Sequence, residues 1–205
     1  MNVLVIGSGG REHAIALKIN QSKKLKSLYC IPGNPGTESI ALNFTIDVKN
    51  HKAIINFCDE KKIDLVVIGP EQPLVDGLSD HLRSAGFKVF GPSANAARIE
   101  SSKSFAKKIM IDASVPSAQY VSFSTAQLSE AFQYIEAIKY PIVIKADGLA
   151  AGKGVLICND KSEAESAIKE ILEQRIFGDS GDKLIIEEFL VGEEASIFAI
   201  TDGDN

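Results

Sequence analysis

Short apolar runs alternate with segments of helical periodicity along the first hundred residues. The continuous apolar runs, which are typical of buried parallel strands, cover 3–6, 27–31, 64–68 and 87–90. Between them, apolar residues recur at helical spacing around 14–19, over 50–61 and over 73–85. Because alternating strands and helices form a right-handed parallel sheet most economically, the pattern predicts an α/β fold with a doubly wound parallel sheet over 1–100.

All four predicted strands end in turns that are rich in glycine or proline. In an open sheet of this kind, ligands bind outside the carboxyl ends of the strands. We therefore expect these turns to line one ligand crevice, which would carry the charged side chains of Arg11, Glu12 and Glu71.

After residue 100 the pattern changes to that of a smaller α+β module. A helix with Phe105, Ile109 and Met110 on one face is predicted to run to Asp112, within a helical linker over 101–118. The module itself follows in 119–190. Its predicted strands lie at 141–146, 154–158 and 183–187, and its capping boxes at Ser124–Gln127 and Ser162–Glu165.

The last residues have the pattern of the first half of a hairpin. Residues 195–201 are predicted to form a strand, and Asp202-Gly203 is a strong turn signal. A returning strand would be needed to cover the strand edge that this leaves exposed. The sequence therefore predicts that 191–205 begin a further subdomain and that the chain is the N-terminal part of a longer protein.

The balance of charge and the composition exclude some classes of partner. Lys and Arg number 22 against 27 Asp and Glu, which gives a net charge of −5, and Trp is absent. A general nucleic-acid binder needs a basic surface or a stacking platform, so no nucleic-acid partner is expected. No apolar stretch approaches the roughly 20 residues of a membrane span. Because the three cysteines also lack disulfide or metal-ligand spacing, we expect a soluble, cytoplasmic protein without a membrane partner.

The glycine turn at 7–12 matches the dinucleotide-binding motif only in part. Glu12 occupies the third glycine position, where a carboxylate is expected to disturb close helix–strand packing. The second strand is also not followed by the acidic residue that holds a ribose, and both departures argue against NAD. Backbone N–H groups of Gly9 and Gly10 at a helix N-terminus, with Arg11 beside them, suit a phosphate or another anion.

The glycine-rich loop at 148–154 is not a P-loop. It has three residues between its first two glycines, where a P-loop has four, and Gly154 follows Lys153, where a P-loop has Ser or Thr. The loop also joins a strand to a strand. We interpret it as a flap that closes over nucleotide phosphates, with Lys145 and Lys153 as two cations for the same phosphates.

An acidic segment follows the last predicted strand of the module. Carboxylates at the strand end, Glu187 and Glu188, can accept a hydrogen bond from the amino group of adenine. The backbone near Leu190 can bind the edge of the ring, and Glu194 can hold ribose hydroxyls. Taken alone, the segment would be interpreted as an acidic, exposed linker.

Five segments occur together and in order along the chain. They are Gly-Ser-Gly-Gly-Arg-Glu-His at 7–13, Pro-Gly-Asn-Pro-Gly-Thr at 32–37, Gly-Pro-Glu-Gln-Pro-Leu-Val at 69–75, Ile-Lys-Ala-Asp-Gly-Leu-Ala-Ala-Gly-Lys-Gly-Val at 144–155 and Ile-Glu-Glu-Phe-Leu-Val-Gly-Glu-Glu-Ala-Ser at 186–196. Over its whole length the chain resembles the phosphoribosylamine–glycine ligase family. The last two segments are specific to the ATP-grasp superfamily, and the first three narrow the resemblance to this ligase.

The resemblance implies a reaction in purine biosynthesis: ATP, glycine and 5-phosphoribosylamine give glycinamide ribonucleotide, ADP and phosphate. ATP would convert the glycine carboxylate to a glycyl phosphate, which the amine nitrogen then attacks. Such chemistry depends on positioning and on neutralising phosphate charge. The resemblance also implies a Rossmann-like, pre-ATP-grasp domain over 1–100, an ATP-grasp lid over 119–190 and the start of the second grasp subdomain at 191–205.

The resemblance assigns ligands to particular residues but no catalytic role. The ATP-binding residues would be Lys103, Lys145, Gly152, Lys153, Gly154, Glu187, Glu188, Leu190 and Glu194. The phosphoribosylamine side of the cleft would contain Gly9, Gly10, Arg11 and Glu71.

The resemblance further implies Mg²⁺ or Mn²⁺, held by ligands beyond residue 205 and by none within 1–205. Residues 1–205 alone are therefore expected to have no ligase activity, and the full-length protein is expected to be a monomer. Two alternatives remain open at this point. One is a non-catalytic module that binds a nucleotide or another anion, and the other is a different ATP-grasp carboxylate–amine ligase or a biotin-dependent carboxylase.

Overall fold

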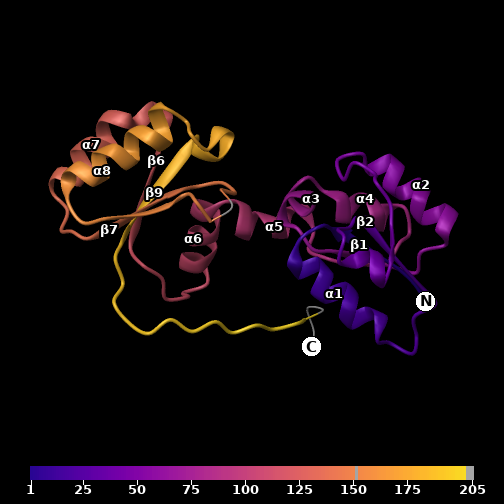
Figure 1. Ribbon diagram of the computed structural model, residues 1–205. Coiled ribbons are helices and arrows are strands. Elements are labelled where there is room, and N and C mark those ends of the chain that lie inside the picture. The colour runs from indigo at the N-terminus through magenta and orange to yellow at the C-terminus, as the bar shows by residue number, and fades with distance from the viewer. Residues whose placement is uncertain (151, 202–205) are drawn as a thin grey trace. The chain divides into compact units, whose positions relative to one another are not determined.

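The chain folds into two compact units, Met1–Ile109 and Met110–Asn205, in the computed structural model (Figure 1). The structure describes residues 1–150 and 152–201. Each unit has its own sheet and its own hydrophobic core. The domain boundaries that the sequence suggests near residues 100, 118 and 190 stay predictions.

The first unit contains a parallel sheet of five strands in the order β3-β2-β1-β4-β5. The strands are β1 (Asn2–Gly7), β2 (Ser27–Pro32), β3 (Leu42–Asn43), β4 (Leu65–Ile68) and β5 (Val89–Phe90). The chain winds outward from β1 through β2 to β3, then returns to place β4 and β5 on the other side of β1. The predicted doubly wound sheet is confirmed, and its strand order reverses between β1 and β4.

Strand β1 is buried on both faces, which is why it consists of an unbroken apolar run. Val3 and Val5 pack in one hydrophobic cluster, and Leu4 and Ile6 pack in another. Helix α1 (Gly10–Asn20) contributes to the first cluster, and helices α2 (His51–Lys61) and α4 (Leu78–Ser84) to the second. Successive side chains of a strand point to opposite faces, so these clusters cover the two sides of the sheet.

Several elements of the first unit differ from the prediction. The helix predicted over 73–85 is two helices, α3 (Glu71–Val75) and α4, because Gly77 between them has a left-handed φ of +83°. Strand β3 was not predicted because two residues carry no periodicity. Helix α5 (Ala94–Ser101) was not predicted either, whereas α6 (Lys103–Asp112) ends at the predicted residue. A single 3₁₀ turn, η1 (Thr37–Ser39), precedes β3.

The second unit contains an antiparallel sheet of four strands in the order β6-β9-β7-β8. The strands are β6 (Tyr120–Ser124), β7 (Ile142–Ala146), β8 (Val155–Cys158) and β9 (Lys183–Glu188). Three of them were predicted. The fourth, β6, lies at the edge of the sheet and was not predicted, although its alternation of apolar residues with serine is typical of a half-exposed strand.

Helices cover one face of this sheet. Figure 1 shows α7 (Leu128–Glu136) and α8 (Lys161–Ile168) side by side over it, and the π-helical segment η3 (Lys169–Glu173) continues α8. Ile142 and Ile144 of β7 are fully buried in the core that these helices form. Because side chains alternate along a strand, Val143 and Lys145 lie on the opposite face.

The two predicted capping boxes have different outcomes. The Ser124 N–H donates to Gln127 Oε1 at 3.2 Å, and this box opens the 3₁₀ turn η2 (Thr125–Gln127) before α7. The prediction of a capping box at Ser162 is wrong. Helix α8 begins two residues earlier in the chain, because the Asp160 carboxylate accepts the Glu163 N–H at 2.9 Å and caps the helix.

The strand predicted over 195–201 is also wrong. These residues form neither helix nor strand in the described structure, and they pair with no strand of either sheet. An apolar run alone does not make a strand, because the strand conformation is stabilised by the ladder to a neighbour. The predicted turn at Asp202-Gly203 lies outside the described residues.

Candidate functional site

The first cluster of predicted site residues lies at the carboxyl ends of β1 and β4. Gly9 caps helix α1, and its carbonyl accepts the His13 N–H at 3.0 Å. The Gly9 N–H donates to Glu12 Oε2 at 2.9 Å, so this N–H is already paired within the turn. The turn therefore has a fixed shape, and the N–H groups available to a ligand are those of the first helical residues, which begin with Gly10.

The Glu12 side chain is the buried centre of this cluster. The residue is only 5% exposed and lies against two glycines. A Cβ at Gly7 would lie 2.4 Å from Glu12 Cγ, and a Cβ at Gly69 would lie 2.3 Å from Glu12 Oε1. The expectation that Glu12 disturbs helix–strand packing is therefore wrong, because glycines after β1 and β4 leave the space that the carboxylate fills.

Arg11 connects the turn after β1 to the beginning of α3 after β4. Its Nε donates to Glu12 Oε1 at 2.9 Å and its Nη1 donates to Glu71 Oε1 at 2.7 Å. The Arg11 and Glu71 side chains are 54% and 44% exposed, so both can reach a ligand. The structure brings together the four residues predicted for this site: Gly9, Gly10, Arg11 and Glu71.

The two carboxylates largely compensate the charge of Arg11. Hydrogen bonds to Glu71 and then to Glu12 raise the pKa of the Arg11 guanidinium above its already high value. The hydrogen bond from Arg11 lowers the pKa of Glu71 below its ordinary range. One guanidinium thus faces two carboxyl groups, so the cluster offers acceptors that suit hydroxyl and amine donors at least as well as a phosphate.

The turn after β2 contributes residues that sequence reasoning did not single out. The Asn34 side chain donates from Nδ2 to the Ser8 carbonyl at 2.9 Å and so ties this turn to the turn after β1. Thr37 is 1% exposed; its Oγ1 accepts the Asn34 N–H at 2.9 Å, and its own N–H donates to Asn34 Oδ1 at 3.0 Å. The sequence signal for this turn was the Asn between two Pro-Gly pairs, because Asn side chains hydrogen-bond to the backbone of turns in this way.

The second cluster lies on the sheet face of the second unit that points away from its core. Lys145 of β7 donates from Nζ to Glu187 Oε2 of β9 at 2.8 Å. Lys145 is paired with Ile185 in the ladder and Val143 with Glu187, so the two charged residues are diagonal neighbours on one face. The Lys145 and Glu187 side chains are 26% and 6% exposed, which makes this a largely buried ion pair.

The glycine-rich loop joins β7 to β8 and is fixed at its first half. The Asp147 N–H donates to the Lys183 carbonyl at 2.9 Å, and the Gly148 N–H donates to the Ser180 carbonyl at 3.1 Å. Ser180 Oγ also donates to the Leu149 carbonyl at 2.7 Å. The connection from strand to strand confirms that this is not a P-loop, whose glycines lead into a helix.

The second half of the loop is a turn that carries an exposed lysine. Gly152 has a φ of +77°, the left-handed conformation that glycine adopts without strain, and Gly154 directly precedes β8. The Lys153 N–H donates to the Ala150 carbonyl at 2.9 Å, and the Lys153 side chain is exposed. The loop therefore has a fixed half beside Lys145 and an exposed half that ends in a second cation.

The remaining predicted residues are more dispersed. Glu188 ends β9, and its Oε1 accepts the Gln119 N–H at 2.9 Å, so its carboxylate is engaged at the neighbouring strand. Leu190 and Glu194 are exposed and lie in 189–201, which forms neither helix nor strand in the described structure. Lys103 is the first residue of α6 and belongs to the first unit.

Within the described residues there is neither a cluster of metal ligands nor a membrane-spanning helix. Within residues 1–150 and 152–201, no group of three or more His, Cys, Asp and Glu side chains could hold a metal ion. In the same described part of the chain, every helix is too short or too polar to traverse a lipid bilayer.

Family models cover the chain from end to end. Residues 1–100 match the model for the N domain of phosphoribosylglycinamide synthetase, and residues 101–205 match the model for its ATP-grasp (A) domain. A curated protein from Caldanaerobacter subterraneus named phosphoribosylamine–glycine ligase is 47% identical over 205 residues, which are 100% of this chain and 49% of that protein. The protein of the same name from Escherichia coli K12 is 46% identical, over 100% of this chain and 48% of its own length.

Solved structures give the same result for the fold. The crystal structure of phosphoribosylamine–glycine ligase from Thermotoga maritima superimposes with a TM-score of 0.74 at 34% identity, over 94% of this chain and 45% of that one. D-alanine–D-alanine ligase from Bacillus anthracis has a TM-score of 0.67 at 18% identity, over 94% of this chain and 58% of that one, which shows a shared fold alone. This chain spans about half the length of the curated relatives that it matches. On the two family models, the chain belongs to the phosphoribosylglycinamide synthetase family.

Proposed function

We propose that the protein formed by this chain, at the length of its relatives, ligates glycine to 5-phosphoribosylamine with ATP. A glycine carboxylate oxygen attacks the γ-phosphorus and releases ADP. The amine nitrogen of phosphoribosylamine then attacks the carbonyl carbon of the glycyl phosphate, releases phosphate and loses a proton to solvent. Relatives at 46–47% identity carry the name of this reaction. The observation on this chain that carries the proposal is the Lys145–Glu187 pair beside the glycine-rich loop.

Lys145 can bind a phosphate without leaving Glu187. A lysine ammonium has three N–H donors, and one of them is directed at Glu187 Oε2. The remaining donors and the positive charge are available to a phosphate oxygen, while the buried carboxylate fixes where the ammonium lies. A carboxylate has about four lone-pair sites, so Glu187 can also accept a hydrogen bond from the adenine amino group, as the sequence predicts.

The loop from 147 to 154 supplies the second cation and excludes water. Its first half is fixed by hydrogen bonds of Asp147 and Gly148, and its exposed half ends in Lys153. Folded over the phosphates, this half would bring Lys153 to them and shield the glycyl phosphate from hydrolysis. Lys103, Gly152, Gly154, Glu188, the Leu190 backbone and Glu194 are assigned to ATP by the sequence resemblance alone.

We assign the cluster after β1 and β4 to phosphoribosylamine, with the roles divided by charge. Glu71 is exposed and ionised, so it suits a ribose hydroxyl or the amine as a hydrogen-bond donor. The first N–H groups of α1, which include that of Gly10, suit the phosphate. Arg11 retains N–H donors beyond the two that it gives to Glu12 and Glu71, and these can join either group.

The family implies Mg²⁺ or Mn²⁺, and the described residues do not fit such a site. No group of three or more His, Cys, Asp and Glu side chains within 1–150 and 152–201 could hold a metal ion. We therefore assign no metal ligand among these residues. A cytoplasmic location and a monomeric state are also part of the proposal; the three cysteines, all free and buried, suit a reducing compartment.

The experiment that tests the ATP site measures nucleotide affinity by calorimetry. Removing a charge-assisted hydrogen bond to a phosphate costs about 1.5–3 kcal/mol, so Lys145→Ala is expected to weaken ATP binding roughly 10- to 100-fold. Lys161→Ala is the matched control, because Lys161 pairs with Glu136 at 2.8 Å on the exposed surface of the same unit. Unchanged ATP affinity in Lys145→Ala would contradict the assignment.

The experiment that tests the reaction measures ADP release that depends on both glycine and 5-phosphoribosylamine. It uses the longest natural reading frame that contains this chain. Release with bicarbonate or another amino acid in place of glycine would favour a different ATP-grasp enzyme. Nucleotide binding without any dependent release would favour a non-catalytic nucleotide-binding module.

A further inference from the structure

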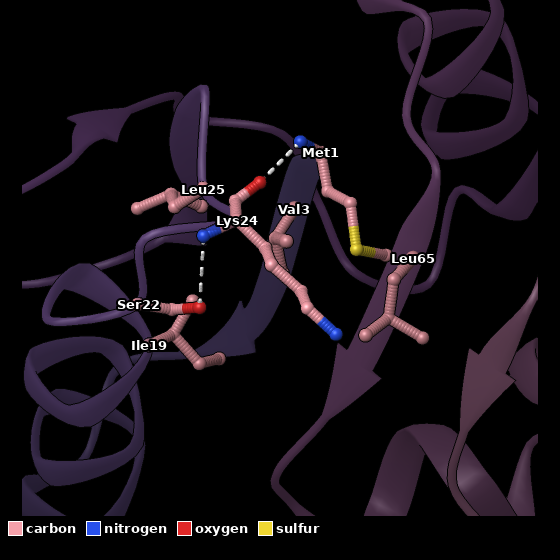
Figure 2. A pocket seen from close by; sticks show the side chains of 7 residues that line it. All are labelled: Met1, Val3, Ile19, Ser22, Lys24, Leu25 and Leu65. Carbon is pink, nitrogen blue, oxygen red and sulfur yellow. Dashed lines mark hydrogen bonds between the residues drawn. The ribbon is translucent and has the colours of Figure 1, made fainter.

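An apolar cavity of about 180 Å³ opens at the end of the first unit's sheet that is opposite to the glycine turns. Its apolar lining comes from Met1, Val3, Ile19, Leu25 and Leu65 (Figure 2). Val3 and Leu65 lie at the amino ends of β1 and β4, whereas the predicted ligand cluster lies at their carboxyl ends. The cavity is therefore separate from the proposed ligase site.

The loop that closes one side of the cavity is held to the beginning of β1. The Met1 nitrogen donates to the Lys24 carbonyl at 2.6 Å, and the Lys26 N–H donates to the Met1 carbonyl at 2.7 Å. The Lys24 N–H also contacts Ser22 Oγ at 3.3 Å. Figure 2 shows the Lys24 side chain extending from this loop toward the side of the cavity on which Leu65 lies.

Lys24, the one lysine among the residues that line the cavity, gives its rim a positive charge in a chain whose net charge is −5. Lys23, Lys24 and Lys26 follow one another closely in the loop and are exposed. Within the part of the chain that the structure describes, none of the three lysines forms an ion pair. Asp64, which precedes Leu65 in the chain, is outside the cavity lining, and its carboxylate accepts the Asn2 N–H at 2.7 Å.

We propose that this cavity binds a medium-chain aliphatic carboxylate, with the alkyl chain among the five apolar side chains and the carboxylate at the Lys24 ammonium. An engineered apolar cavity of about 150 Å³ in another protein binds benzene, so this volume accommodates a chain of roughly six carbons. The uncompensated charge at the rim selects an anion over a neutral or cationic head group. The proposal does not depend on the ligase reaction.

Two magnitudes follow from the chemistry of the site. Each methylene that enters the cavity is expected to strengthen binding about fourfold, until the cavity is filled. The Lys24 ammonium is exposed, so its ion pair with the carboxylate is expected to contribute a factor of only about two to five.

The test follows the methyl NMR signals of the chain during titration with butanoate, hexanoate and octanoate. Hexanol serves as the uncharged probe. Saturable shifts are expected at Val3, Ile19, Leu25 and Leu65, with affinity that rises from butanoate to hexanoate and changes little from hexanoate to octanoate, because the cavity is then filled. Lys24→Ala is expected to weaken hexanoate two- to fivefold and leave hexanol unchanged. Lys23→Ala is the matched control, since Lys23 is a neighbouring exposed lysine outside the cavity lining, and it is expected to change neither ligand by more than twofold.

A second variant keeps the test independent of the folding of the core. Ser22 is exposed and lines the cavity, so Ser22→Phe can fill it without disturbing β1 or β4, and is expected to abolish binding of every probe. The proposal is overturned if hexanoate gives no saturable shifts, if hexanol binds as tightly as hexanoate, or if binding survives in Ser22→Phe.

Discussion

Replacing Glu12 by glutamine tests whether a buried carboxylate holds the turn after β1 in shape. The carboxylate accepts the Gly9 N–H and the Arg11 Nε–H, each at 2.9 Å. Glutamine fills the same space but has one oxygen and one NH₂ group, so one of the two donors loses its acceptor. A hydrogen bond to a charged group contributes about 1.5–3 kcal/mol to stability. The bond from Arg11 contributes less than the bond from Gly9, because Arg11 is exposed and water screens its charge. Glu12→Gln is therefore expected to lower the free energy of unfolding by about 2 kcal/mol.

The matched control is Glu71→Gln, because Glu71 contacts the same arginine from an exposed position. Its side chain is 44% exposed, against 6% for Glu12, so the loss is expected to stay below about 1 kcal/mol. Urea unfolding followed by circular dichroism gives both free energies. Equal losses in the two variants would refute the argument, since the difference between them measures the buried bond to Gly9.

The close packing of the Glu12 side chain against Gly69 predicts that substitutions of these two residues are energetically coupled. A Cβ at Gly69 would lie 2.3 Å from Glu12 Oε1, so Gly69→Ala must displace the carboxylate in the natural chain. Once Glu12 is alanine, the added methyl group has room. The double-mutant cycle of Glu12→Ala with Gly69→Ala is therefore expected to give a coupling energy above about 1 kcal/mol, and additive effects would contradict the packing described for this turn.

Three further outcomes follow from the structure. Gly148→Ala would place a Cβ 2.6 Å from the Ser180 Cα, so it is expected to destabilise the loop by about 1–3 kcal/mol and to weaken ATP binding in calorimetry. Burial raises the pKa of the Cys58 thiol to about 12. This thiol is therefore expected to react with a thiol reagent in urea but not in the native state. Burial and the neighbouring His81 lower the pKa of His51, so the unfolded state binds the proton more tightly than the folded state. The stability of the natural chain is therefore expected to fall as the pH drops below about 6.5, and the urea midpoint of His51→Gln is expected to fall less over the same pH range.

Burial is the main reason why protonation of His51 is unfavourable, and the geometry of the histidine pair adds to it. His81 Nδ1 lies 2.9 Å from the Gly77 carbonyl, which can only accept, so this nitrogen carries a hydrogen. His51 Nδ1 lies 3.1 Å from the same nitrogen and must therefore be the acceptor. A proton on His51 Nδ1 would place two N–H groups against each other.

The sequence predicted the first unit well because its signals are local. Unbroken apolar runs such as 3–6 identify strands that are buried on both faces, and the turns after them place the candidate site residues at one edge of the sheet. The features that the sequence could not predict depend on contacts between residues that are far apart in the chain. Glu12 appeared to be a misfit in a glycine motif, and only the neighbouring Gly69, which follows β4, shows why the chain accommodates it.

The errors in the second unit have the same physical cause. The run at 195–201 has strand propensity, but a strand is stabilised by its neighbour, and the described structure provides no ladder there. Ser162 was predicted as a cap from its spacing to Glu165, whereas Asp160 accepts the Glu163 N–H and begins the helix two residues earlier. Asp and Ser are both good cap residues, so their local preferences do not decide which of the two caps the helix.

The Lys145–Glu187 pair shows how a ladder register can create a site from separate motifs. The sequence assigned Lys145 to phosphate and Glu187 to adenine as independent residues, since 42 positions separate them. The antiparallel pairing of Val143 with Glu187 makes the lysine and the carboxylate diagonal neighbours, and the exclusion of water makes each necessary to the other. A largely buried ammonium without this carboxylate would be costly, and a buried carboxylate without the ammonium would be costly as well. The two groups are thus fixed on folding, so if Lys145 binds a phosphate as we propose, the entropy of ordering the lysine need not be lost again on binding.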